Sequence, residues 1–223
     1  LEPETMHGII PAVDRIERAI KENQKIVIYG DYDVDGITAV STLLGLFKLL
    51  NAQVDYYIPH RVDEGYGLNI DAIEQIHAAG ANLLISVDCG ITAFKTAPFA
   101  REKGLDLIIT DHHRPEPDGR LPEAVAIVHP NLDPNYPAQY SSGAAVAFKL
   151  AWAVVNRLKG GNTTPQHLRQ FLINATIFAA MGTIADVVDL RGENRIISSF
   201  GLRAIADSKL PGIEALIAAA GIK

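Results

Sequence analysis

Residues 25–50 read KIVIYGDYDVDGITAVSTLLGLFKLL and fall into three parts with different local preferences. Lys25–Tyr29 is rich in β-branched residues and predicts a short buried strand. The acidic turn Gly30–Gly36 follows it, and Ile37–Leu50 then has the length and apolar composition of a helix. A strand that leads through a polar turn into a helix is the repeating unit of parallel α/β sheets.

The same alternation continues along the chain. Further β-rich runs predict strands at residues 53–58, 82–87, 106–110 and 124–128. Helical patterns lie before the first strand and between most of the others, at residues 8–23, 37–50, 70–79 and 91–103. Right-handed βαβ units of this kind predict a doubly wound α/β domain with a mainly parallel, five-stranded sheet.

Beyond Pro137 the pattern becomes helical. Helices are expected at residues 141–157, 165–181, 194–207 and 213–219, with a break at residues 159–162. We therefore divide the chain into an α/β metal-binding domain, residues 1–136, and a helical segment, residues 137–223, that completes the core.

Composition limits the class of protein. The chain has 223 residues, a formal net charge of -6 and a single cysteine, Cys89, so an intramolecular disulfide is excluded and a reducing cytoplasm is favoured. No apolar run approaches the roughly 18 to 20 uninterrupted residues that span a bilayer, so we expect no membrane partner. The negative charge argues against nonspecific coating of nucleic acid, although bound cations would reverse the local field of an acidic site.

Polar residues follow three of the expected strands. The first ends in Asp31, Asp33 and Asp35, the third in Asp88, and the fourth in Asp111-His112-His113. Ligands of parallel sheets bind at the carboxyl ends of the strands, so these side chains should converge there. Mutual repulsion among them requires a counter-charge, and oxygen ligands with one or two imidazoles suit Mn²⁺ or Mg²⁺.

Each part of this pattern has a simpler interpretation. Asp31–Gly36 could be a calcium-binding turn, but Thr42 stands where the calcium loop requires glutamate. One of its aspartates could cap the following helix, and a His-His pair in a loop is usually exposed and inert. The joint placement after three strands favours the metal site.

Four ordered segments resemble the motifs of the DHH phosphoesterases: Asp31–Gly36 (DYDVDG), Val87–Gly90 (VDCG), Thr110–His113 (TDHH) and Gly182–Asp186 (GTIAD). Within that family, Pro59–Leu68 (PHRVDEGYGL) and Asn131–Pro134 (NLDP) are similar to the RecJ branch. The resemblance extends over essentially the whole chain.

The resemblance implies roles for individual residues. The implied metal ligands are Asp31, Asp33, Asp35, Asp88, His112 and Asp186, and these six residues together with His113 are the implied catalytic residues. His113 would face the substrate phosphate, while Arg61 and Tyr66 would contact single-stranded DNA through phosphate and base. Only the resemblance assigns Asp186, because residues 175–187 otherwise have the pattern of a buried helix. Asp106, Asp111 and Asp189 are left with supporting or structural roles.

The implied activity is two-metal hydrolysis of single-stranded DNA in the 5′-to-3′ direction, releasing 5′-mononucleotides, with a role in DNA repair and recombination alongside other repair proteins. Two alternatives stay open: a phosphodiesterase for oligoribonucleotides or cyclic dinucleotides, and a non-catalytic replication scaffold. RecJ proteins usually continue into a second α/β domain and an oligonucleotide-binding barrel, which we expect this chain to lack. Because it begins with Leu1, we expect it to be part of a longer protein.

Overall fold

The computed structural model describes residues 1–159 and 163–221. Its centre is a five-stranded sheet in the order β2-β1-β3-β4-β5, and every neighbouring pair is parallel. The strands are β1 (Ile26–Gly30), β2 (Val54–Tyr57), β3 (Leu83–Val87), β4 (Asp106–Thr110) and β5 (Ala126–Val128). The predicted doubly wound α/β class is confirmed, and all five predicted strands form.

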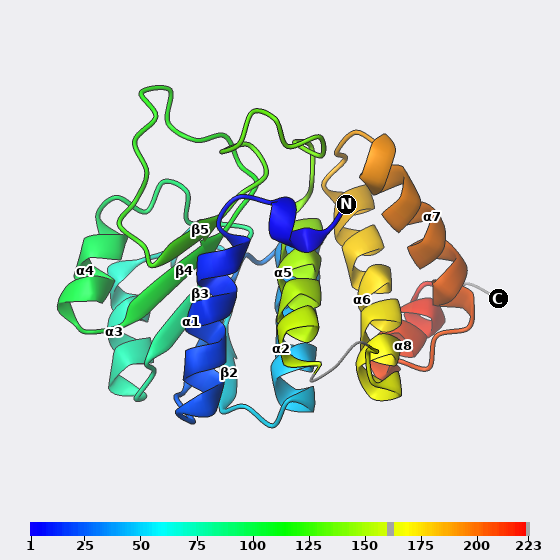
Figure 1. Ribbon diagram of the computed structural model, residues 1–223, viewed down its shortest axis with the longest axis horizontal. Helices are drawn as coiled ribbons and strands as arrows, with labels where there is room; N and C mark the ends of the chain where they lie inside the picture. Colours follow the sequence, from blue (N-terminus) through cyan, green and yellow to red (C-terminus); the bar gives the residue numbers. More distant parts are fainter. Residues whose placement is uncertain (160–162, 222–223) are drawn as a thin grey trace.

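Helices cover both faces of this sheet (Figure 1). On one face, α1 (Ile9–Lys21), α2 (Val34–Leu49) and α5 (Gly143–Leu158) pack on the strands through residues such as Ile28 and Ile85. On the other, α3 (Ile70–Ala78) and α4 (Thr96–Glu102) cover Val27 and Leu84. Residues of β1, β3, β4 and β5 alternate between two apolar layers, which explains why these runs are largely apolar, whereas the edge strand β2 is partly exposed.

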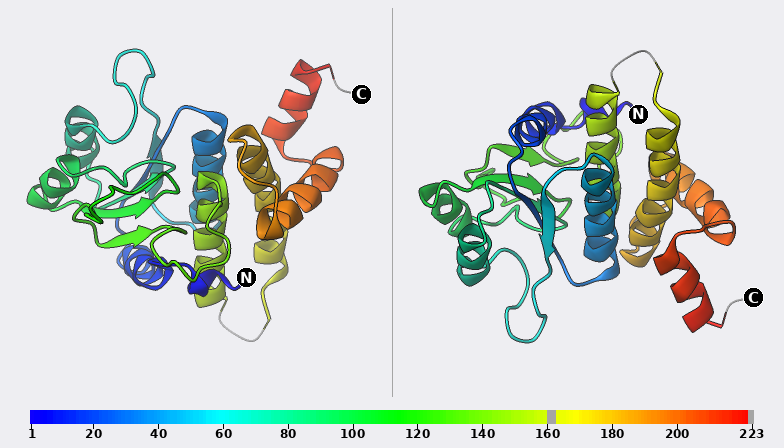
Figure 2. Two further views of the ribbon diagram at one scale, coloured as in Figure 1. Left: turned by 90° about the horizontal axis from the view of Figure 1, so that it is seen from above. Right: turned by 90° about the horizontal axis from the view of Figure 1, so that it is seen from below.

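The C-terminal helices add further layers. α6 (Gln166–Ala185) packs on α2 and α5, and α7 (Gly192–Ala206) packs on α6. Figures 1 and 2 show that α2 and α5 lie between the sheet and α6 and α7, with α8 (Pro211–Ala219) at the outer end. The short 3-10 helix η1 (Pro3–Thr5) contacts α1 and α5. The predicted division at residues 136 and 137 stays a prediction, and residues 160–162 of the predicted break lie outside the described residues.

Two helices, α2 and α4, begin three or more residues away from their predicted starts. α2 begins at Val34 rather than Ile37, because Asp33 caps it by accepting a hydrogen bond of 2.9 Å from the N–H of Gly36. α4 begins at Thr96 rather than Ile91, which brings Pro98 into its first turn, where a missing N–H is tolerated.

α6 is long and apolar enough, by length and composition alone, to cross a membrane. It contacts α2, α5 and α7, and the core helix of a soluble protein passes the same test. Packing in the fold buries 39% of the apolar window of this helix.

Candidate metal centre

The strand order places the acidic turns on either side of a topological switch point. β1 lies between β2 and β3, so the connections from β1 and β3 leave the sheet in opposite directions and open a crevice at their carboxyl ends. Asp31 follows β1, Asp88 follows β3 and His112 follows β4. The predicted convergence at this edge is therefore built into the topology.

Three overlapping groups of side chains converge here, with their potential ligand atoms within 4.8 Å of one another. They are Asp31, Asp33 and Asp88; Asp35, His112 and Asp186; and Asp88, His112 and His113. All the predicted metal ligands thus lie together, Asp186 included. Asp186 reaches the group because α6 packs on α2 and ends next to it.

His112 lies at the centre of the cluster. Its Nε2 atom is 3.2 Å from Oδ1 of Asp88 and 3.7 Å from carboxylate oxygens of both Asp35 and Asp186. Among the described residues, His112 Nε2 and Asp88 Oδ1 are buried atoms that make no hydrogen bond. Buried polar atoms without a partner are costly, and a shared cation would satisfy both.

The donor set also fits a cation. Ligand atoms about 2 to 2.5 Å from one divalent ion lie ~3 Å from each other, close to the separations around His112. Carboxylates with one imidazole match Mn²⁺ or Mg²⁺ in hardness. The residues present therefore fit the predicted cofactor.

Burial and like charge shape the titration of the cluster. Burial, together with the nearby Asp35 carboxylate, raises the pKa of Asp88 to about 7. Burial also raises the pKa of Asp35 and Asp31. For His112, burial lowers the pKa, but Asp88 and Asp35 more than offset this and leave the pKa raised. Without a cation, the cluster favours bound protons.

Asp88 is held in a strained backbone. Its φ of 59° lies in the left-handed region, which aspartate tolerates better than most residues. Its N–H donates to the carbonyl of Thr110, and its side chain lies against Gly143, where an added Cβ would come within 2.5 Å of Oδ1. Backbone strain of this kind is found mainly at functional sites.

Asp33 combines the two interpretations that the sequence left open. One of its oxygens, Oδ1, caps α2, and the residue still belongs to the group with Asp31 and Asp88. Asp33 is exposed to solvent.

His113 is fixed by Asp111 and Tyr66. Its Nδ1 atom lies 2.7 Å from Oδ1 of Asp111 and 3.1 Å from the hydroxyl of Tyr66. The hydrogen bond to Asp111 raises the pKa of His113 to about 9, so the ring is a cation at neutral pH. With Nδ1 engaged by Asp111, the ring can offer Nε2–H to an anion.

The predicted substrate contacts border the cluster. The Tyr66 hydroxyl donates to the carbonyl of Asp88 at 3.2 Å, and the Arg61 guanidinium lies 5.2 Å from the centre of the Tyr32 ring. Arg61, Tyr32 and Tyr66 thus form a basic and aromatic rim beside the acidic residues.

Sequence reasoning missed part of the site. Asp111 does more than its predicted supporting role suggests, because it also accepts hydrogen bonds from the main-chain N–H groups of Ile91, His112 and His113. The main-chain amides of Gly143 and Ala144, at the start of α5, bind Asp35 rather than a phosphate, while Ser142 caps the helix.

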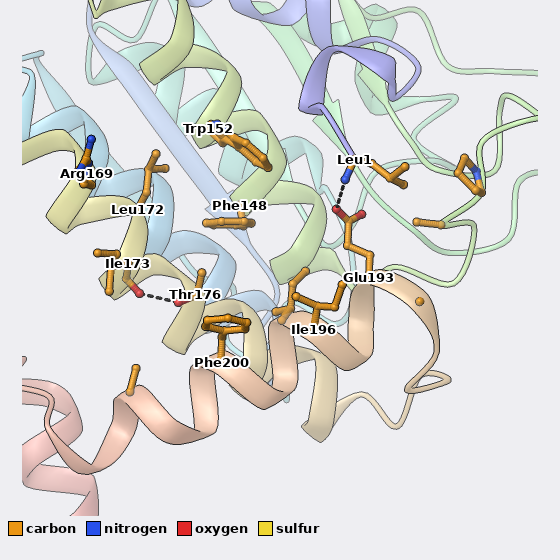
Figure 3. A pocket seen from close by; sticks show the side chains of 15 residues that line it. Leu1, Phe148, Trp152, Arg169, Leu172, Ile173, Thr176, Glu193, Ile196 and Phe200 are labelled. Carbon is orange, nitrogen blue, oxygen red and sulfur yellow. Dashed lines mark hydrogen bonds and ion pairs between the residues drawn. The ribbon is translucent and has the colours of Figure 1, made fainter. Parts of the chain in front are cut away.

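An apolar cavity lies apart from this cluster. It has a volume of about 800 Å³ and lies among α5, α6 and α7. Figure 3 shows its apolar lining, which includes Phe148, Trp152, Leu172 and Phe200. Phe148 is buried, whereas Trp152 is only partly buried and faces this cavity.

The fold and the cluster define a class of parallel α/β domains with an aspartate and histidine site for divalent cations at the switch point. The model of the DHH family, N-terminal domain, matches residues 25–177, and the chain belongs to this family.

Within the family, the chain is similar to the single-stranded-DNA-specific exonuclease RecJ. It is 45% identical to that of Bacillus subtilis over 99% of this chain and 26% of the relative. It is 37% identical to that of Escherichia coli over 95% of this chain and 37% of the relative. The chain therefore spans about a quarter to two fifths of the length of these relatives.

Solved structures agree with this relationship. The crystal structure of an exonuclease RecJ bound to manganese matches with a TM-score of 0.87 and 35% identity, over 100% of this chain and 54% of that chain. RecJ of Thermus thermophilus in complex with Mn²⁺ matches with a TM-score of 0.82 and 33% identity, over 98% of this chain and 30% of that chain. The predicted resemblance is confirmed.

Proposed function

We propose that this chain is the catalytic core of a metal-dependent exonuclease that hydrolyses single-stranded DNA in the 5′-to-3′ direction and releases 5′-mononucleotides. The observation that supports this most directly is the cluster around His112, in which carboxylates from three distant segments surround two buried atoms without hydrogen bonds. The relatives named above are single-stranded-DNA-specific exonucleases, and two of the solved structures contain manganese.

We assign two divalent cations, Mn²⁺ or Mg²⁺, to Asp31, Asp33, Asp35, Asp88, His112 and Asp186. When bound, such cations activate water and neutralise the charge that develops on a phosphodiester. The remaining steps fall to the chain's own residues. They orient the cluster, hold the phosphate and guide the strand.

His113 is suited to hold the scissile phosphate. Asp111 accepts a hydrogen bond from Nδ1–H and stabilises the charged ring, so Nε2–H can donate to a phosphate oxygen. The Tyr66 ring packs edge-on against the imidazole, with the ring centres 5.6 Å apart. Arg61 provides a second phosphate contact, and the Tyr32 and Tyr66 rings provide faces on which a base can stack.

We also infer a cytoplasmic role in DNA repair and recombination, together with other repair proteins. Cys89 is buried and free, as suits a reducing compartment. The single-stranded DNA preference of the named relatives is the property that repair of damaged strands requires.

The test is hydrolysis of end-labelled single-stranded DNA by this chain, with Mn²⁺ and with EDTA. Asp88→Asn is the inactive control, since it removes a charge but keeps a side chain that tolerates positive φ. We expect Mn²⁺-dependent release of 5′-mononucleotides from the 5′ end. The same assay with dinucleotides tests the alternative phosphodiesterase, and turnover of dinucleotides alone would refute a DNA substrate. Absence of Mn²⁺ binding in calorimetry would favour the non-catalytic scaffold.

A further inference from the structure

His129 is a buried histidine that the proposed chemistry does not yet use. It directly follows β5, so it lies at the same carboxyl edge of the sheet as Asp31, Asp88 and His112. Its side chain is fully buried. The strand argument that identified the other residues applies equally to this position, since β5 pairs with β4 in parallel.

Both ring nitrogens of His129 have defined partners. The N–H of Asn131 donates to Nδ1 at 3.1 Å, and Nε2 lies 2.8 Å from the main-chain carbonyl of His113. An amide N–H can only donate, so Nδ1 must accept, and the ring proton of the neutral imidazole must reside on Nε2. Nε2–H therefore donates to the carbonyl of His113. Burial lowers the pKa of His129, which agrees with a neutral ring.

This hydrogen bond acts on the residue assigned to the phosphate. Asp111 fixes the N–H of His113 at 3.0 Å and its Nδ1 atom at 2.7 Å. His129 holds the main-chain carbonyl of His113 through its Nε2–H donor. The two peptide planes next to His113 are thus both restrained, and their orientation sets the direction of the Cα–Cβ bond and of the imidazole.

We propose that His129 is a positioning residue that, through its Nε2–H donor to the carbonyl of His113, aims the His113 imidazole at the scissile phosphate. The proposal rests on the proposed function for its effect on catalysis. His129 acts through His113, whose neighbour His112 belongs to the cation cluster. Phosphate binding and metal binding should therefore respond differently to substitutions at position 129.

Two substitutions separate the hydrogen bonds of His129. In His129→Gln the amide nitrogen can reach the place of Nε2 and donate to His113. In His129→Asn the amide oxygen can reach the place of Nδ1 and accept from Asn131, but the donor to His113 is lost. We expect His129→Asn to lower kcat/KM for single-stranded DNA roughly tenfold or more, and His129→Gln to stay within about threefold of the unsubstituted chain. Both variants should bind Mn²⁺ as tightly as the unsubstituted chain in calorimetry.

A merely structural role gives a different pattern. Loss of folding stability would lower kcat/KM, Mn²⁺ affinity and the melting temperature together, in both variants. That result, or equal kcat/KM for His129→Asn and His129→Gln, would overturn the proposal.

A second readout does not depend on activity. In NMR spectra of the Mg²⁺-loaded, isotope-labelled chain, the unsubstituted protein should show His129 with its proton on Nε2. His129→Asn, but not His129→Gln, should shift the His113 imidazole signals and weaken their response to inorganic phosphate. Unchanged His113 signals in His129→Asn would refute the positioning role. An inactive unsubstituted chain with the expected NMR pattern would instead count against the proposed function alone.

Discussion

The carboxylate of Asp35 accepts a hydrogen bond of 2.5 Å from the main-chain N–H of Gly143, which lies 108 positions further along the chain. Its second oxygen accepts from the N–H of Ala144 at 3.0 Å. These amides are the free donors at the start of α5, where the helix dipole favours a negative charge. The start of α5 therefore orients Asp35, and the helical part of the chain takes a direct part in building the cation cluster.

This arrangement predicts that substitution by asparagine lowers the stability of the metal-free fold at Asp35 but not at Asp88. In Asp35→Asn an NH₂ group replaces one acceptor oxygen and faces the N–H of Gly143 or Ala144, which should cost about 1 to 3 kcal/mol. In Asp88→Asn a buried charge next to other carboxylates disappears, so the metal-free fold should keep or gain stability.

Thermal melting in EDTA and in Mn²⁺ checks this contrast. We expect a lowered melting temperature in EDTA for Asp35→Asn only, and loss of the Mn²⁺-induced rise for both variants. Asp55→Asn, on the exposed part of β2, is the matched control and should retain the rise. Equal melting temperatures of the two cluster variants in EDTA would contradict the role given to the α5 amides.

The titration of Asp88 predicts how pH affects metal binding. Its pKa is raised from 3.8 to about 7, so between these values the metal-free fold holds a proton that the unfolded chain releases. The stability from this proton is present below the unfolded pKa and is lost as pH rises through about 7. A cation must displace the proton, and His112 must likewise be neutral to bind it.

We therefore expect Mn²⁺ affinity to fall steeply as pH drops from about 8 to 5.5, and hydrolysis with it. The melting temperature should show the same coupling, with a large Mn²⁺-induced rise at pH 8 and a small one at pH 5.5. Calorimetry across this range, in buffers that do not bind metal, provides the measurement. An affinity that does not change with pH would show that the cluster is not protonated in the absence of metal.

The sequence predicted the part of the site that depends on strand ends, because a buried apolar strand followed by carboxylates is a local pattern. Asp31, Asp88 and His112 were found in this way, and the parallel order of β1, β3 and β4 brings them together. Asp186 required the family resemblance. Its position depends on α6 packing against α2, and a contact between two helices far apart in sequence has no local signal.

Other features escaped prediction because they depend on main-chain geometry. The amides that bind Asp35 belong to Gly143 and Ala144, whose side chains give no sign of this role. Asp33 both caps α2 and belongs to the cation cluster, whereas the sequence suggested these two roles as alternatives. His129 did have a signal, since it directly follows the strand predicted at residues 124–128.

The contact between α6 and α2 provides a prediction about Gly182. A Cβ at this position would lie 2.2 Å from Oδ1 of Asp35 and 2.5 Å from the Cβ of Ala144. Gly182→Ala must therefore displace α6 or Asp35, and Asp186 lies one turn further along the same helix. We expect a loss of stability of about 1 to 3 kcal/mol, together with a roughly tenfold or greater loss of Mn²⁺ affinity.

Gly212→Ala is the matched control for this substitution. Gly212 lies in α8, where an added Cβ meets nothing within 4 Å among the described residues. Alanine should stabilise that helix by up to about 1 kcal/mol and leave Mn²⁺ binding unchanged. Urea denaturation and calorimetry distinguish the two variants, and normal Mn²⁺ affinity in Gly182→Ala would rule out the tight packing between α6 and Asp35.

Val187, which directly follows Asp186 at the end of α6, gives a prediction about stored strain. Its φ is 60° and its side chain is 86% exposed, so a β-branched residue adopts the left-handed conformation with little packing in return. Glycine removes a penalty of about 1 to 2 kcal/mol and adds back roughly 0.5 to 1 kcal/mol through the greater freedom of the unfolded chain. Val187→Gly should therefore raise the free energy of unfolding by up to about 1 kcal/mol in urea denaturation. Val62→Gly, at a similarly exposed valine (83%) outside the left-handed region, should give no such gain, and an equal response of the two valines would show that the end of α6 is not strained.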